Sequence, residues 1–363
     1  MILVLGMMSG TSLDGVDAAL IETDGQVIAG FGRSGFRAYD SKEGAVLYGA
    51  LGQWPGGPGV ADAAALSVTA HAALAADFPE AVLIGYHGQT LAHDPQGRGT
   101  HQAGDGAALA RAVGRPVVWD FRTEDVRQGG EGAPLVPFFH HACARWAVAA
   151  GRLEPAPVLI LNLGGVGNVT WLDPSIPAAE EATLAFDTGP ANAPLNDLML
   201  ARCGAARDEG GVLALSGQAD PAVVAGFLRH PFFDRPPPKS LDRDAWGGLV
   251  AAVAGLSDAD AAATLTEAAA AAVGAGLRWL PEAPARLLVC GGGRHNGAMM
   301  AALARQTGMA PEPVEAIGLD GDMLEAHAFG WLAVRVMRGL PTSGPTTTGA
   351  PGPVGGGRIS HPR

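Results

Sequence analysis

Three segments of the chain share one layout, in which a short apolar run ends in a glycine-rich turn and a second segment follows. The turns occupy residues 6–15, 164–168 and 291–296. Strand-forming residues flank the first two turns, which predicts two β-hairpins with wide glycine turns. An apolar stretch at helical spacing follows the third turn, which predicts a strand entering a helix with Asn296 near the helix start. Because the hairpins begin at Ile2 and Val158, we expect a duplicated architecture.

The segments between these turns predict further strands and helices in alternation. Strands are expected at residues 81–85 and 115–119, and helices at residues 61–76, 105–113, 258–280 and 323–338. Such alternation indicates an α/β fold with a mixed sheet in each half of the chain. Composition alone predicts disorder for residues 341–363, since 11 of these 23 residues are Gly or Pro.

Length, charge and cysteine content narrow the class of protein. A chain of 363 residues has room for two domains. Its 36 acidic residues outnumber 24 Lys and Arg, and the net charge of −12 disfavours binding to nucleic acid or to an anionic membrane surface. No apolar run reaches membrane-spanning length. The widely spaced Cys143, Cys203 and Cys290 form no disulfide framework, so we expect a cytoplasmic protein, and the sequence leaves a homodimer open.

The string GMMSGTSLDGVD at residues 6–17 is the strongest functional signal. Lys42 and Lys239 are the only lysines, and neither completes a Walker-A nucleotide loop. A turn of Gly, Ser and Thr can instead bind an anion through backbone N–H groups and hydroxyls. Asp14 and Asp17 add carboxylates that could hold Mg²⁺ beside phosphates. An ordinary polar hairpin is the alternative interpretation of this turn.

The other two glycine turns are weaker signals on their own. The turn at residues 164–168 enters a strand rather than a helix, which argues against a dinucleotide-binding fold. Together with the first turn, it is interpreted as a second phosphate-binding turn. The glycines at 291–293 fit a close approach of backbone to a flat ligand such as adenosine, with a tight strand–helix turn as the alternative.

Asp187 lies in the string FDTGP, the second strong signal. Asp-Thr-Gly is typical of aspartic proteases, but that chemistry needs two carboxylates that share a proton. A two-lobed protease of this length would carry a second such string, and the chain has none. A single carboxylate at a strand end suits a general base or a group that positions a hydroxyl, with structural capping of the turn as the alternative.

Polar residues also follow several other predicted strands. His87 and Gln89 follow one strand, Gln102 and Asp105 follow the next loop, and Asp120 and Arg122 follow a third segment. Strand ends beside glycines are where α/β proteins bind ligands, and amide and carboxylate groups suit sugar hydroxyls. Arg122 or Arg127 could hold a carboxylate by a forked pair. Lys239 is expected in a surface loop, since lysines are usually exposed, with a loop contact to phosphate or substrate as the alternative.

Taken together, these strings resemble the anhydro-N-acetylmuramic acid kinase family. The resemblance spans the chain in order, over residues 6–17, 87–90, 100–106, 120–137, 161–170, 186–192, 236–240, 291–296, 324–333 and 343–363. It implies two ribonuclease-H-like domains of the actin-like ATPase type, with mixed sheets flanked by helices and an active-site cleft between them. We expect domains at residues 1–135 and 136–334, with about 335–363 packing back on the first. The last segment is therefore expected to be ordered.

The resemblance also implies a reaction and a set of site residues. Members of this family use ATP and Mg²⁺ to open 1,6-anhydro-N-acetylmuramic acid with water and phosphorylate O6, giving N-acetylmuramic acid 6-phosphate in cell-wall recycling. Asp187 would be the catalytic base, and Asp14 a Mg²⁺ ligand. The residues expected to bind the amino sugar are His87, Gln89, Gln102, Asp120, Arg122, Thr188 and Gly189. Those expected to bind ATP are Gly10, Thr11, Ser12, Leu13, Asp14, Gly15, Val16, Asp17, Gly164, Gly165, Asn168, Gly291, Gly292, Gly293 and Asn296.

Three departures from the family pattern, at Glu131, Ala191 and Asn196, bear on loop geometry and fine sugar specificity rather than on Asp187. Two other functions compete with this interpretation. One is a kinase of the same superfamily that acts on an ordinary hexose or amino sugar. The other is an ATP-gated binding protein, which would need an additional partner-binding domain for which the chain has little room. A sugar requirement for ATP turnover would separate them.

Overall fold

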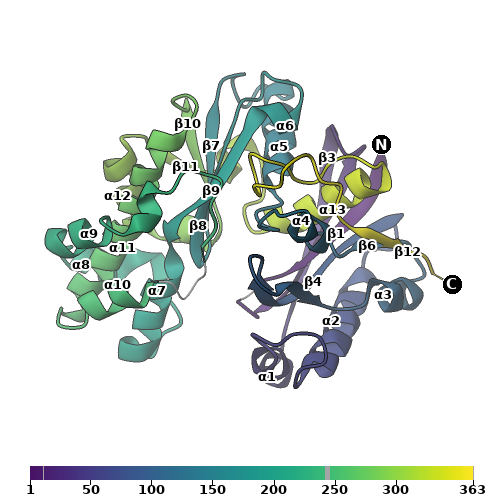
Figure 1. The fold of residues 1–363 in the computed structure, drawn as a ribbon, viewed down its shortest axis with the longest axis horizontal. Helices are drawn as coiled ribbons and strands as arrows, with labels where there is room; N and C mark the ends of the chain where they lie inside the picture. The colour runs from purple at the N-terminus through teal and green to yellow at the C-terminus, as the bar shows by residue number, and fades with distance from the viewer. Residues whose placement is uncertain (11, 242–245, 363) are drawn as a thin grey trace. The chain divides into compact units, whose positions relative to one another are not determined.

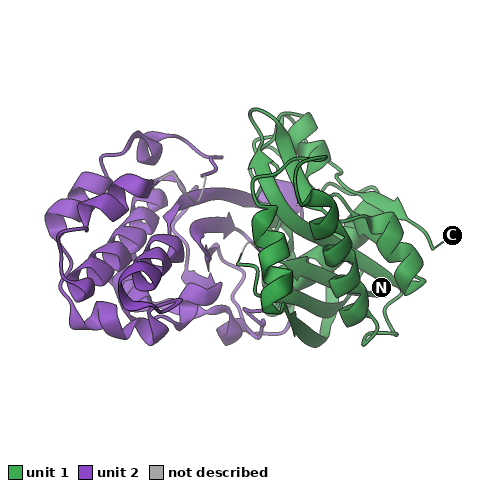
Figure 2. Ribbon diagram, turned by 90° about the horizontal axis from the view of Figure 1, so that it is seen from below, with its two compact units in different colours: residues 1–149, 323–363 green, residues 150–322 purple. Residues whose placement is uncertain are grey.

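The computed structural model describes residues 1–10, 12–241 and 246–362. The chain forms two compact units, which Figure 2 colours separately: unit 1 comprises residues 1–149 and 323–363, and unit 2 comprises residues 150–322. The boundary expected after residue 334 differs from this division by helix α13 (Leu324–Met337), which belongs to unit 1. The boundary expected after residue 135 differs by one helix, α5 (Pro137–Ala149). This helix belongs with unit 1 because Trp146 packs edge-on against Phe31, with 4.9 Å between the ring centroids.

Unit 1 is built on a mixed sheet that the described residues form with seven strands, ordered β12-β6-β4-β1-β2-β3, with β5 paired to β4. Strands β1, β2 and β3 are antiparallel neighbours, whereas β1, β4 and β6 run parallel. Figure 1 labels most of its elements, which are β1 (Ile2–Ser9), β2 (Gly15–Thr23), β3 (Ile28–Ala38), α1 (Ser41–Gly49), α2 (Val60–Ala75), β4 (Leu83–Asp94), β5 (Gly99–Ala103), α3 (Gly106–Val113), β6 (Val117–Trp119), α4 (Thr123–Arg127), α5, α13 (Leu324–Met337) and β12 (Arg358–Ser360).

Alternating residues of β1 and β4 cover the two faces of this sheet. Leu5 and Tyr86 belong to a buried cluster with residues of α2 and α3, including Leu74. Gly6 and Gly85, which adjoin Leu5 and Tyr86 in the sequence, lie on the opposite face, where helix α13 packs. A Cβ on Gly6 would collide with the carbonyl oxygen of Ala326. The glycines of the first strands therefore allow a helix backbone to lie directly on the sheet.

Unit 2 repeats the same arrangement with a sheet of five strands among its described residues, ordered β11-β10-β7-β8-β9. The order β3-β2-β1-β4-β6 in unit 1 corresponds to the order β9-β8-β7-β10-β11 in unit 2. The predicted α/β class and the predicted duplication are therefore confirmed. The elements are β7 (Val158–Leu163), β8 (Val166–Leu172), α6 (Ala179–Ala182), β9 (Thr183–Pro190), α7 (Asn192–Leu198), α8 (Val212–Ser216), α9 (Pro221–Phe227), α10 (Gly247–Ala252), α11 (Asp258–Gly276), β10 (Arg286–Cys290), α12 (Gly297–Thr307) and β11 (Pro311–Pro313).

The helix α11 is the central helix of unit 2. One buried cluster joins its Ala269 and Val273 to Leu161 of β7 and to Met299 of α12. A second cluster joins its Ala268 and other small residues to the shorter helices α7 to α10. The alanines predicted as a helix therefore allow close contact on two sides, with the sheet and with further helices.

The end of the chain is ordered, as the family resemblance implied and composition alone did not. Strand β12 pairs with β6 in antiparallel register, Arg358 opposite Trp119. Thr342, Ser343 and Thr348 are buried, and Val354 is fully buried. Disorder was predicted from glycine and proline content, but hydroxyl groups here find buried hydrogen-bond partners that composition does not reveal.

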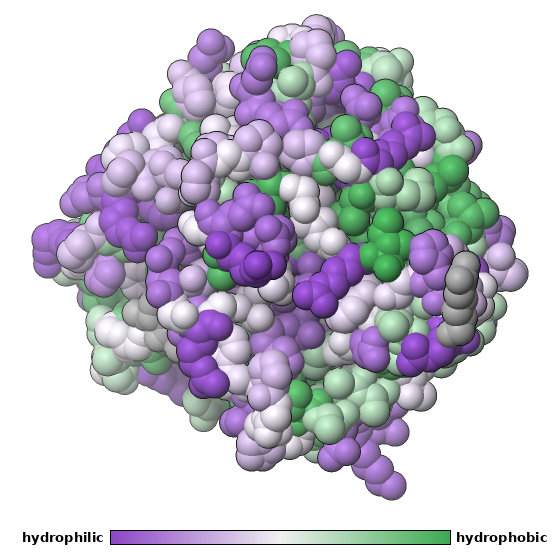
Figure 3. All heavy atoms as spheres, turned by 45° about the vertical axis from the view of Figure 1, so that its right-hand side comes forward, coloured by the Kyte–Doolittle hydropathy of each residue, from purple (hydrophilic) through white to green (hydrophobic). Residues whose placement is uncertain are grey.

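The described residues contain no helix that is both long and apolar enough to cross a membrane. Some large apolar side chains are nevertheless exposed, including Phe36, Tyr48 and Val82 in unit 1. On the face drawn in Figure 3, hydrophobic groups are interspersed with hydrophilic ones. Single exposed apolar residues are common on protein surfaces and identify no particular site.

Candidate active site

The first hairpin forms as predicted, with its turn between Ser9 at the end of β1 and Gly15 at the start of β2. Gln89 of β4 fixes this turn by two hydrogen bonds. The Ser9 hydroxyl donates to Oε1 of Gln89 at 2.6 Å, and Nε2 of Gln89 donates to the Gly10 carbonyl at 3.1 Å. Gln89 is fully buried. Both ends of the Gln89 amide therefore bond to the hairpin, and its role in sugar binding stays a prediction.

The turn and the start of β2 contain both exposed polar residues and a buried apolar residue. Leu13 adopts a left-handed backbone with φ of 57°. Ser12 and Asp14 are exposed, and the Ser12 hydroxyl donates to Oδ1 of Asp14 at 2.8 Å. Val16 has its side chain in the core, which leaves only its backbone for the predicted contact with ATP. Asp17 is half-buried on β2, and Thr11 lies outside the described residues.

A magnesium ligand set fits this turn only if the nucleotide supplies most of it. The described residues contain no group of three or more His, Cys, Asp or Glu side chains that could hold a metal ion. Mg²⁺ is usually bound by one or two carboxylates, with phosphate oxygens and waters completing the shell. The exposed carboxylate of Asp14 meets that requirement.

A small pocket in unit 1 collects three of the residues predicted to bind sugar. His87, Gln102 and Asp120 line it, together with Tyr86, Gly88, Ala103, Gly104 and Trp119. The amide of Gln102 donates to the Thr100 hydroxyl at 2.8 Å. Asp120 has a left-handed backbone with φ of 58°, and its carboxylate accepts from Thr123 and pairs with Arg358 at 2.9 Å. Arg358 was missed because it lies in the segment whose composition predicts disorder.

Arg122 connects this pocket to the loop that follows it. Its Nε donates to Nε2 of His87 at 3.1 Å, and its Nη1 donates to the Gly132 carbonyl at 2.8 Å. The His87 ring packs on Phe329, with 4.5 Å between centroids. Burial, together with the charge of Arg122, holds the pKa of His87 well below its usual value. His87 therefore serves as a neutral ring.

Two other polar residues of this region have structural partners. Asp105 accepts from the backbone N–H of Ala107 at 2.8 Å and caps helix α3. Arg127 is exposed and pairs with Glu124 on the same helix. Of the two arginines considered for a carboxylate ligand, only Arg122 is connected to the pocket.

In unit 2, the predicted catalytic Asp187 lies on β9, where it is in register with Asn168 of the second hairpin. Its backbone N–H donates to the carbonyl of Lys239 at 2.9 Å. Its Oδ2 accepts from the N–H of Leu241 at 2.8 Å. The loop at residues 239–241 thus holds both the backbone and the carboxylate of Asp187, which is half-buried.

The residues after Asp187 fasten β9 to the second hairpin turn. The Thr188 hydroxyl donates to the Gly167 carbonyl at 3.0 Å, and Thr188 is buried. The backbone N–H groups of Ala191 and Asn192 donate to the carbonyls of Gly165 and Gly164, each at 3.0 Å. A side chain on Gly189 would crowd Ala272 of α11. These contacts fix the conformation of the turn, and the hydroxyl proton of Thr188 is used in one of them.

The third turn also forms as predicted, and Asn296 caps helix α12. Its Oδ1 accepts from the N–H of Met299 at 3.0 Å, and its contact with the nucleotide stays a prediction. Gly291 has φ of 74°, and a Cβ there would collide with Oδ1 of Asn162. Gly292 has open space around it. Arg294, which sequence reasoning missed, donates to the Gly291 carbonyl at 3.1 Å and to Asp322 at 2.9 Å.

Lys239 contradicts the prediction of an exposed loop residue. Its side chain is only 4% exposed, and its Nζ donates to the Phe232 carbonyl at 3.0 Å. The ammonium also lies over the Phe232 ring, 4.4 Å from the centroid. Burial, reinforced by the nearby Arg278 and Arg235, lowers the pKa of Lys239 to about 8.

The family model described as anhydro-N-acetylmuramic acid kinase matches residues 59–361. The chain belongs to this family. A relative from Cereibacter sphaeroides carries that name, is 61% identical and covers 99% of this chain and 96% of its own length. As a member of the family, the chain is an ATP-dependent kinase.

More distant relatives extend the same likeness. The kinase of a Ruegeria species is 56% identical, with 99% of this chain and 94% of the relative covered. The kinase of Rhodospirillum rubrum is 49% identical, with 97% and 92% covered. Among solved structures, a ROK family glucokinase from Streptomyces griseus is 15% identical, with a TM-score of 0.41 over 91% of this chain and 99% of that chain. Because the curated relatives match nearly end to end, the family assignment covers both units.

Proposed function

We propose that the chain opens the anhydro ring of 1,6-anhydro-N-acetylmuramic acid with water and transfers the γ-phosphoryl group of ATP to the freed O6. The observation that carries this proposal is that the loop at residues 239–241 fixes Asp187 by two hydrogen bonds. The backbone N–H and the Oδ2 of Asp187 are both hydrogen-bonded, so the orientation of its carboxylate is fixed. A general base needs this fixed orientation more than a strongly shifted pKa. The second hairpin, with Asn168 beside Asp187, supports a common site for base and phosphate.

The steps balance as a hydrolysis coupled to a phosphoryl transfer. Asp187 accepts a proton from water as the water oxygen bonds to the anomeric carbon, and the bond from that carbon to O6 breaks. O6 bonds to the γ-phosphorus as the bond from that phosphorus to the β,γ-bridging oxygen breaks, and ADP leaves. Asp187 then releases its proton to solvent. The products are ADP and N-acetylmuramic acid 6-phosphate. Phosphoryl transfer depends mainly on positioning and on charge stabilisation rather than on covalent help from the protein.

We assign the nucleotide to the three glycine turns. The backbone of residues 10–15 and of Gly164 and Gly165 would bind the phosphates, and the exposed Gly292 would lie against the adenosine. Asp14 is the carboxylate proposed to hold Mg²⁺, which, bound with ATP, offsets the charge of the phosphates. The pocket of His87, Gln102 and Asp120 is assigned to the sugar. Because the reaction consumes ATP, we place it in the cytoplasm, where it would return a cell-wall sugar to metabolism.

The test measures ADP release with ATP and Mg²⁺, with and without 1,6-anhydro-N-acetylmuramic acid, in ¹⁸O-water. We expect the sugar to stimulate ADP release and the product to carry one ¹⁸O at the anomeric carbon and phosphate on O6. Turnover only with an open hexose would instead indicate a general sugar kinase, and ATPase activity indifferent to sugars a binding protein. Asp187→Asn should lower the rate about 10²- to 10⁴-fold while ATP binding is retained.

A further inference from the structure

Lys239 is an unusual residue for its place in the chain. It is one of only two lysines, and it is buried, which is rare for a lysine. Its ammonium is held by the Phe232 carbonyl at 3.0 Å and by the face of the Phe232 ring. The rings of Phe186 and Trp279 lie farther away, each with its centroid at 5.9 Å. An aromatic enclosure of this kind stabilises a cation once water has been removed.

The backbone of the same residue reaches Asp187. The Lys239 carbonyl accepts the N–H of Asp187, and two residues later the N–H of Leu241 donates to Oδ2 of that carboxylate. The anchored ammonium and the two contacts to Asp187 therefore belong to one short stretch of chain. Phe186, which precedes Asp187 on β9, also forms part of the aromatic surroundings of the ammonium.

We propose that Lys239 is a positioning residue for the reaction. Its ammonium, anchored on Phe232, fixes the main chain of residues 239–241, and that main chain orients the carboxylate of Asp187. This inference rests on the proposed role of Asp187 as the general base. The ammonium itself touches no reacting atom. Small displacements of a catalytic group cost rate because the group must lie in line with the atom it serves.

Burial sets the direction in which the pKa of Lys239 shifts, and the charges around it act in both directions. Arg278 and Arg235 disfavour its charged form, Asp234 and Asp187 favour it, and burial outweighs these charges, with the result that the pKa is lowered to about 8. Above that pH the amine still donates to the Phe232 carbonyl but loses its attraction to the ring. We therefore expect kcat to fall as pH rises through about 8, and this decline should be absent in Lys239→Met.

The decisive experiment is a double-mutant cycle on kcat for ring opening, followed by ¹⁸O incorporation. Lys239→Met keeps the unbranched apolar body of the side chain and removes the charge and the hydrogen bond to the Phe232 carbonyl. We expect it to lower kcat about 10- to 100-fold while the KM values for ATP and sugar change little. In the Asp187→Asn background the same substitution should have almost no further effect, because residues that act as one unit are not additive. Lys42→Met is the matched control, since Lys42 is the only other lysine and is exposed at the start of α1; its kcat should equal that of the parent.

Two results would overturn the inference while leaving the general base in place: a normal kcat in Lys239→Met, or an equal loss in the parent and Asp187→Asn backgrounds. Full activity of Asp187→Asn would instead remove the proposed base, and the inference with it. If Lys239→Met does not fold, Phe232→Leu removes the ring under the ammonium and keeps the backbone acceptor. That variant should lower kcat in the parent and not in Asp187→Asn, and a loss in both would overturn the inference.

Discussion

The guanidinium of Arg122 donates a hydrogen bond from Nε to Nε2 of His87 over 3.1 Å. Arginine has only donors, so Nε2 must be the unprotonated nitrogen of the ring. The ring proton is then on Nδ1, which donates to the Gly88 carbonyl at 2.9 Å. One arginine thus fixes the tautomer of the histidine that lines the pocket assigned to the sugar.

Arg122→Lys should weaken sugar binding without affecting the nucleotide. Lysine carries its three N–H donors on a single nitrogen in place of a planar fork, so it cannot satisfy His87 and the Gly132 carbonyl in the same geometry. We expect the KM for sugar to rise about 10-fold or more, in keeping with about 1.5–3 kcal/mol for a charged hydrogen bond, and the KM for ATP to stay unchanged. Arg127→Lys, on the exposed side of α4, is the control. Equal effects of both substitutions on the KM for sugar would contradict this assignment.

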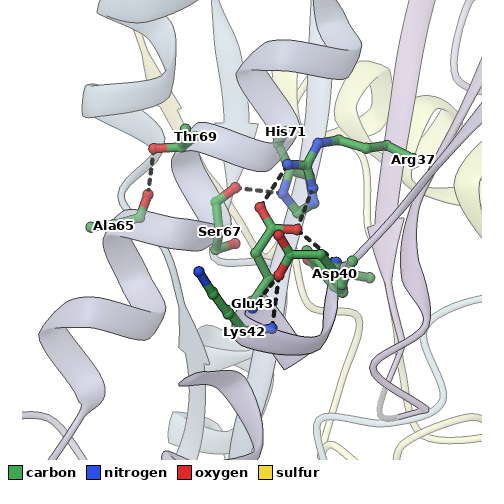
Figure 4. A network of polar contacts seen from close by, with 10 residues as sticks. Arg37, Asp40, Lys42, Glu43, Ala65, Ser67, Thr69 and His71 are labelled. Atoms are coloured by element: carbon green, nitrogen blue, oxygen red, sulfur yellow. Dashed lines mark hydrogen bonds and ion pairs between the residues drawn. The ribbon is translucent and has the colours of Figure 1, made fainter. Parts of the chain in front are cut away.

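Unit 1 should lose stability in mild acid because of His71. Figure 4 shows His71 beside Ser67, whose carbonyl accepts from its Nδ1 at 2.7 Å. Burial lowers the pKa of His71 to about 4, whereas the unfolded chain has its ordinary value near 6.5. The unfolded state therefore binds more protons between these values, and stability falls as pH drops through 6.5 and levels off below about 4.

The expected loss from His71 is about 2 kcal/mol in the free energy of unfolding between pH 7.5 and pH 5. The buried His140, whose pKa is lowered to about 3, adds a loss of the same sign. Urea unfolding at the two pH values measures the sum. His71→Gln should reduce the difference, and the exposed His361→Gln should leave it unchanged. A pH difference that His71→Gln does not reduce would show that other groups cause it.

Asp125 connects the end of the chain to the loop beside the pocket assigned to the sugar. Its buried carboxylate accepts from the hydroxyls of Ser343 and Thr348 and, at 2.7 Å, from the N–H of Gly132, whose carbonyl receives Arg122. Asp125→Ala leaves these donors without a partner, so we expect a loss of about 2–4 kcal/mol in stability and a raised KM for sugar. Glu124→Gln, next to it on α4, should change neither. Thermal unfolding and sugar kinetics test both expectations.

Gly291 and Gly292 should respond differently to alanine. At Gly291 a Cβ meets Oδ1 of Asn162 and the backbone is left-handed, so Gly291→Ala should lower stability by about 1–3 kcal/mol. Gly292 has open space, so Gly292→Ala should fold normally and raise the KM for ATP if adenosine lies against it. Thermal unfolding and ATP kinetics of the two variants separate strain from ligand contact. An unchanged KM for ATP in Gly292→Ala would remove this glycine from the nucleotide site.

What the sequence predicted well was local. The hairpin turns and the cap at Asn296 depend on residues within a few positions of one another, and glycine, serine and asparagine have strong preferences at such places. The partners of Gln89 and Lys239 could not be predicted in this way. Gln89 meets Ser9 across 80 positions, and the Lys239 ammonium is buried by rings from three separate segments. Whether a polar side chain faces a ligand or holds the fold depends on such distant contacts.

The same limit explains the end of the chain. A glycine- and proline-rich segment has little apolar surface of its own, so composition predicts disorder. Ser343 and Thr348 are ordered by a carboxylate more than two hundred positions earlier, at Asp125. Only the family resemblance carried that information, because relatives preserve the outcome of contacts that no local pattern encodes.

The assembly of unit 1 from residues 1–149 and 323–363 has a consequence for synthesis on the ribosome. A nascent chain that ends at residue 322 contains all of unit 2, yet unit 1 still lacks helix α13 over its sheet and strand β12 at its edge. The usual order, in which the N-terminal domain completes its folding first, is therefore reversed. Until translation reaches the last forty residues, the glycine-lined face of the first sheet stays uncovered and is a site for chaperone binding or misassembly.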